Sequence, residues 1–160
     1  MKPPGSVYWS ALEPYWDSIS IYDGGEEFQS ELRAVPALVQ TLFAAHWCSS
    51  EVCNGGLKQL FTNSTGVLAP EAVMAFRALG MPALADVLSE AMKVFGSSYS
   101  REREVREEQL EKLRLASADP YAWRPFDKLD RRFFALLDTE NGGFPSTADA
   151  YVLRLHPPEG

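Results

Sequence analysis

Residues 51–66 have the sequence EVCNGGLKQLFTNSTG, which predicts a helix that stops, turns and starts again. Asn54-Gly55-Gly56 predicts the stop, because glycine readily adopts the left-handed conformation that is common at helix ends. Residues 57–63 predict a short helical turn that ends at Asn63-Ser64-Thr65-Gly66. We call residues 51–66 the corner. Ahead of it, helical spacing relates Val39, Leu42, Phe43 and His46.

The corner concentrates polar side chains beside apolar ones. Glu51 continues the Phe43–Trp47 stripe of the preceding helix, so its carboxylate is expected to be partly buried and hydrogen-bonded. The side-chain amides of Asn54, Gln59 and Asn63 could donate hydrogen bonds to this carboxylate. Two interpretations follow: a polar network that locks the corner, or a pocket for a ligand or partner.

Helical patterns continue on both sides of the corner. Apolar residues of 82–95 follow one face of a helix: Leu84, Val87, Leu88, Ala91 and Phe95. Proline suits the first turn of a helix, and it predicts helices that begin at Pro36, Pro70 and Pro82. Pro14 is expected to interrupt any helix over residues 7–22.

Further helices are expected at 26–33 and 101–117. One more is predicted to start at Asp119-Pro120, and a last one near Ser146 with Asp149 in its cap. No sustained two-residue alternation occurs, so no strand is predicted. The sequence therefore predicts an all-α fold: one compact domain over residues 1–160, with about seven to eight helices.

Composition narrows the possible functions. The 160 residues carry 15 Lys and Arg against 22 Asp and Glu, a net charge of −7. Such a charge argues against direct binding of nucleic acid, which needs a positive surface. No apolar run is long enough for a membrane span, and no secretory signal is recognised, so a cytoplasmic location is expected.

No pattern in the sequence points to a cofactor or metal. His46 is interpreted as a core histidine, and Cys48 and Cys53 as inert thiols, because the two cysteines do not share a helix face. Asp127 and Asp130 lie one turn apart near Arg131 and are interpreted as surface charges that pair locally. We expect no catalytic residue, no cofactor and no metal ligand.

The acids are unevenly distributed. Residues 7–31 form an aromatic and acidic segment, and no Lys or Arg occurs between Lys2 and Arg33. Its candidate partner-binding carboxylates are Asp17, Asp23, Glu26, Glu27 and Glu31. The helix over 101–117 is a poorer candidate because its acids are expected to pair along the helix, as Glu102–Arg106, Glu108–Lys112 and Glu111–Arg114.

A longer pattern extends from the corner. It includes Glu51, Val52, Asn54, Gly55, Gly56, Gln59, Phe61, Asn63, Ser64 and Gly66, and continues through the sequence APEAVMAFRALG at 69–80. This pattern resembles the DNA-mimic protein family, over about residues 30–155. The chain departs from the usual pattern at Cys53 and at Leu57, where an aromatic residue is common.

The resemblance implies an all-helical acidic fold, a homodimer, and a protein that occupies the DNA-binding surface of a transcription regulator. In that role carboxylates lie where phosphates would. The first hypothesis is therefore a non-enzymatic acidic module that binds a basic protein surface. The alternatives are an immunity-type inhibitor of a nucleic-acid-directed toxin, and a small-molecule sensor or enzyme that uses Glu51, Asn54, Gln59 and Asn63.

Overall fold

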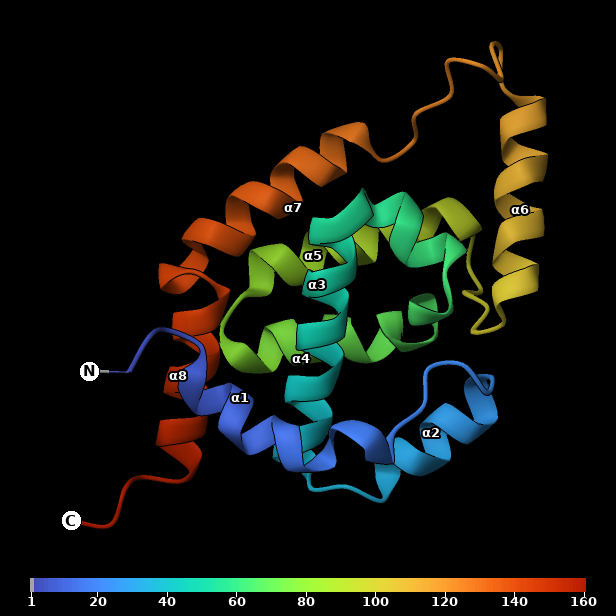
Figure 1. Ribbon diagram of the computed structural model, residues 1–160. Helices are drawn as coiled ribbons and strands as arrows, with labels where there is room; N and C mark the ends of the chain where they lie inside the picture. The colour runs from blue at the N-terminus through green and yellow to red at the C-terminus, as the bar shows by residue number, and fades with distance from the viewer. Residues whose placement is uncertain (1) are drawn as a thin grey trace.

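The computed structural model describes residues 2–160, and α-helices and short 3-10 helices account for its regular structure (Figure 1). The α-helices of these residues are α1 Ser6–Leu12, α2 Gly25–Arg33, α3 Ala37–Thr62, α4 Ala69–Leu79, α5 Pro82–Met92, α6 Arg103–Ala116, α7 Asp127–Thr139 and α8 Phe144–Leu155. The 3-10 helices are η1 Glu13–Ser18, η2 Ser64–Leu68, η3 Lys93–Phe95 and η4 Glu140–Gly142. The all-α prediction is confirmed.

Helix α3 is the central element, and α1, α2, α4, α6 and α7 all contact it (Figure 1). Its length is lined with buried side chains, including the fully buried Leu42, Phe43, Cys48 and Val52. These belong to one hydrophobic cluster that runs from Tyr8 to Val152. Burial of apolar surface around α3 therefore supplies the main stabilisation of the fold.

The predicted stop at the corner is a kink inside α3. Gly55 and Gly56 have non-helical backbone angles, with φ of +79° at Gly56, and the helix resumes at once. The freed N–H of Leu57 donates to Asp130 Oδ1 on α7 at 2.8 Å. A Cβ on Gly56 would lie 3.0 Å from the Asp130 carboxylate. The prediction of Asp130 as a surface-paired charge is therefore wrong, because it caps the second half of α3.

Two other local predictions are corrected by long-range contacts. Asp119 does not start a helix: its carboxylate accepts the N–H of Tyr121 at 3.1 Å in a turn, and α7 begins at Asp127. Asp149 does not cap its own helix. It accepts N–H groups from Gly5 at 2.7 Å and Tyr8 at 2.8 Å, and so holds the start of α1 against α8.

The N-terminal segment folds as predicted around Pro14, because α1 ends at Leu12 and η1 follows. His46 is partly buried beside it, with Nδ1 3.1 Å from the Tyr8 hydroxyl, and burial lowers the pKa of His46. Cys48 is buried and its pKa is raised by that burial, as expected for an inert thiol. None of the helices in residues 2–160 combines the length and the apolar character needed to cross a bilayer.

Candidate functional site

The acidic segment, residues 7–31, runs along one side of the molecule through α1, η1 and α2 (Figure 1). Asp17 lies on η1, Asp23 in the turn before α2, and Glu26 and Glu27 in the first turn of α2. All four are exposed, and within residues 2–160 none of them forms an ion pair. Their charge is therefore not neutralised by a contact in the fold.

Helix α2 presents its acids outward because its apolar face is fixed against the core. Phe28 and Leu32 are buried, while Glu26 and Glu27 are exposed at the helix N-terminus, where negative charge is favourable. Gly25 has no room for a side chain, since a Cβ there would lie 2.8 Å from Cβ of Arg101. Its N–H donates to Glu102 Oε1 at 3.2 Å.

Glu31 differs from the other four carboxylates. It is partly buried, and its Oε1 accepts the N–H of Ser20 at 2.9 Å. This bond ties the chain between η1 and α2 to the α2 helix. Glu31 therefore stabilises the segment as well as adding to its charge.

Part of the ion pairing predicted along α6 is confirmed. Lys112 lies 2.9 Å from Glu108, and Arg114 lies 2.6 Å from Glu111. The predicted pair of Glu102 with Arg106 is wrong. Glu102 accepts a hydrogen bond from the N–H of Gly25 on α2, and Arg106 is 0% exposed.

Arg106, on α6, is a buried polar residue that contacts the corner, and sequence reasoning placed it in a surface pair instead. Its guanidinium donates to four backbone carbonyls: those of Phe61 at 2.9 Å, Asn63 at 2.8 Å, Ser100 at 3.1 Å and Arg101 at 2.6 Å. No carboxylate of residues 2–160 forms an ion pair with it, and burial lowers its pKa. The positive charge instead lies at the end of α3, where carbonyl groups carry partial negative charge.

Two neighbours complete the Arg106 environment. The guanidinium carbon lies 5.7 Å from the centre of the Tyr99 ring, and the Tyr99 hydroxyl donates to the Gly66 carbonyl at 2.6 Å. A Cβ on Gly66 would lie 2.6 Å from Arg106 Nη2. Gly66 is therefore required by the close approach of a buried guanidinium. The sequence contains a signal for the burial of Arg106, since Arg106 lies one turn before Leu110 on the same face of the helix.

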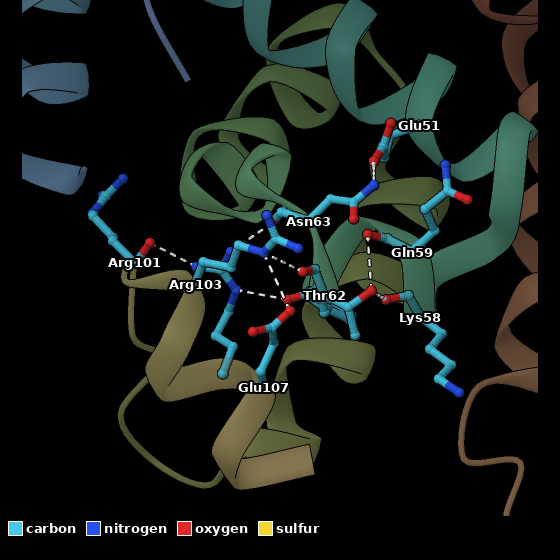
Figure 2. Close-up of polar contacts among 10 residues, drawn as sticks. Glu51, Lys58, Gln59, Thr62, Asn63, Arg101, Arg103 and Glu107 are labelled. Carbon is cyan, nitrogen blue, oxygen red and sulfur yellow. Dashed lines mark hydrogen bonds and ion pairs between the residues drawn. The ribbon is translucent and has the colours of Figure 1, made fainter. Parts of the chain in front are cut away.

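The corner brings together some of its predicted residues. Figure 2 shows the Asn63 amide donating to Glu51, and on the opposite side Arg103 contacting Thr62 and Glu107. Asn54 is exposed, and neither its side chain nor that of Gln59 forms a hydrogen bond within residues 2–160. The geometry gives the Glu51–Asn63 pair a role in holding the two halves of the corner.

Among five surface hollows of residues 2–160, Ser64 of the corner lines one and Cys53 another, but Glu51, Asn54, Gln59 and Asn63 line none of the five. One hollow of about 210 Å³ lies in the acidic segment, where it brings Asp17 and Glu31 together beside Trp16 and Trp47. In residues 2–160 no group of three or more His, Cys, Asp or Glu side chains is placed to hold a metal ion.

The family model for DMP19-like proteins matches residues 33–156, most of the chain. This chain belongs to the DMP19-like protein family. The match confirms the resemblance to the DNA-mimic family, and it contains the corner, Arg106 and Asp130. The acidic segment lies ahead of the matched residues. Neither the curated proteins nor the solved structures contain a match to this chain.

Proposed function

We propose that this DMP19-like protein is a non-enzymatic acidic module that occupies a basic, DNA-binding surface on a protein partner. The observation that carries the proposal is the set of exposed carboxylates without ion pairs in the acidic segment: Asp17, Asp23, Glu26 and Glu27. The net charge of −7 and the family membership support it.

The size of the charged surface limits what it can imitate. Duplex DNA carries about one negative charge per 1.7 Å of axis, so a 20 Å stretch carries about 12 phosphates. Four free carboxylates can replace only a few of these phosphates. A homodimer, which the family resemblance implies, would double the net charge of −7 and present two such segments.

The alternatives differ in the partner or in the site. An immunity-type inhibitor would use the same carboxylates against a toxic nuclease or deaminase, and the identity of the captured partner separates these two functions. A sensor or enzyme would use the corner. The hydrogen bond between Glu51 and Asn63 supports a structural use of that pair, so we favour the acidic segment as the binding site.

The test removes the four free charges and asks whether partner binding is lost. We expect the variant D17N/D23N/E26Q/E27Q to bind at least about tenfold more weakly at low salt, because four charge contacts would be lost. Affinity capture from the native lysate identifies the partner, and titration of the purified pair gives the affinity. Duplex DNA is expected to displace this protein from the partner.

A matched control removes the same charge elsewhere. Four exposed carboxylates outside the segment form neither ion pairs nor hydrogen bonds within residues 2–160: Glu104, Asp127, Asp138 and Glu159. Their conversion to amides should leave affinity largely intact. Equal loss in both variants, or an affinity that does not fall as salt rises, would contradict the proposal.

A further inference from the structure

The hollow in the acidic segment has an unusual lining for a charged surface. It is built from η1, the chain that follows it, α2 and α3, and its lining includes Trp16, Asp17, Ser20, Tyr22, Glu31 and Trp47. Its volume of about 210 Å³ is below the range typical of small-molecule sites. It therefore suits a single side chain better than a whole cofactor or metabolite.

One wall of the hollow is a stacked pair of indole rings. Trp16 and Trp47 have ring centres 5.2 Å apart and an angle of 12° between their planes. Trp16 also packs against Phe43, His46 and Trp9, so the pair is anchored to the core. Trp47 is partly buried, and within residues 2–160 Trp16 is its one aromatic neighbour.

The same hollow carries two carboxylates. Asp17 is exposed and has no ion pair, and Glu31 uses only Oε1 for the Ser20 N–H, which leaves Oε2 without a hydrogen bond inside the described chain. No lysine or arginine is among its lining residues. Aromatic rings together with free carboxylates favour a cation, and a planar guanidinium can both stack on an indole and donate to carboxylates.

We propose that this hollow receives an arginine side chain of the protein partner. The inference rests on the proposed function and deepens it, because it names one contact within the acidic segment. The charge of the hollow is complementary to arginine, and the indole wall distinguishes a guanidinium from an ammonium group. The segment therefore selects arginine over lysine, where a purely electrostatic surface would accept both.

The test uses two short acetylated and amidated peptides that differ only in their basic residues. One carries arginines, and the other carries lysines at the same positions between glycines and serines. Fluorescence titration of the full chain at low salt should show about two- to fivefold tighter binding of the arginine peptide. In the wild-type protein, the arginine peptide should shift the indole N–H resonances of Trp16 and Trp47 more than that of Trp123.

Two variants separate the hollow from the general charge. Trp47→Leu should abolish the preference for arginine while both peptides still bind. The variant E26Q/E27Q removes exposed charge outside the hollow, so it should weaken both peptides alike and keep the preference. The resonance shifts are measured on the wild-type protein, so they test whether arginine binds in the hollow even if Trp47→Leu does not fold.

The outcomes distinguish the two proposals. Equal binding of both peptides by the wild-type protein, or unchanged Trp16 and Trp47 resonances on arginine binding, would overturn the role of the hollow and leave the proposed function standing. Failure to bind either peptide at low salt would overturn both. A preference that survives in Trp47→Leu would place the arginine site elsewhere.

Discussion

The acidic segment and the corner both concentrate charged and polar residues, but they use them in opposite ways. In the acidic segment, Asp17, Asp23, Glu26 and Glu27 are exposed and make no ion pair in the described chain. In the corner, Glu51 accepts a hydrogen bond from Asn63, and the buried Arg106 of α6 donates to the corner carbonyls of Phe61 and Asn63 as well as to those of Ser100 and Arg101.

The difference separates charges that hold the fold from charges that remain available to a partner. The family match begins at residue 33, so it contains the corner and not the acidic segment. The residues that the family model matches thus include the corner, and the surface proposed to bind a partner lies ahead of them. Stability and partner binding should therefore respond to different substitutions.

The largest expected effect is that of Arg106→Met. Loss of the guanidinium leaves the carbonyls of Phe61, Asn63, Ser100 and Arg101 without their donor. Each buried unsatisfied group costs about 1–3 kcal/mol, so we expect the free energy of unfolding to fall by about 3 kcal/mol or more. Urea denaturation measures it.

Arg103→Met is the matched control on the same helix. Arg103 is about half exposed and pairs with Glu107, so the loss should be within about 1 kcal/mol. Similar losses for the two variants would contradict the assignment of Arg106 as the residue that holds the corner.

The next largest effect is that of Gly66→Ala. The added Cβ would lie 2.6 Å from Arg106 Nη2, so the guanidinium must shift away from its carbonyl partners. We expect a loss of about 1–3 kcal/mol in the free energy of unfolding. In the Arg106→Met background the same change should cost much less, because the clashing group is gone. Additive losses of stability in that double-mutant cycle would contradict the explanation that Gly66 is required by its close approach to Arg106.

Local rules in the sequence predict a large part of this fold. The helical spacing of residues such as Leu84 and Leu88, and the prolines at helix starts, identify the buried helices. The paired glycines at 55–56 identify the break in α3, because glycine permits the φ of +79° at Gly56. These signals are local, and they depend on the period of a helix or on the backbone freedom of one residue.

The contacts that sequence reasoning missed join distant elements. Asp130 caps α3 across 73 residues, Asp149 caps α1 across more than 140, and Arg106 reaches carbonyls 43 and 45 residues away. Spacing along one helix identifies only the charged residue nearest to each of these side chains on the same helix, such as Glu102 for Arg106. It therefore predicts ion pairs on the surface. Whether a charged group is buried depends on which element packs over it, and local spacing does not contain that information.

The smallest expected effect on stability is that of D17N/D23N/E26Q/E27Q, the same variant that should weaken partner binding. None of the four carboxylates pairs with a base in the described chain, so no ion pair is lost. Loss of Glu26 and Glu27 from the first turn of α2 costs about 0.3–1 kcal/mol each, and reduced repulsion among like charges offsets part of this. We expect the free energy of unfolding to change by about 1 kcal/mol or less in urea denaturation. A loss as large as that of Arg106→Met would mean that the fold itself uses these charges, and the contrast between the two regions would not hold.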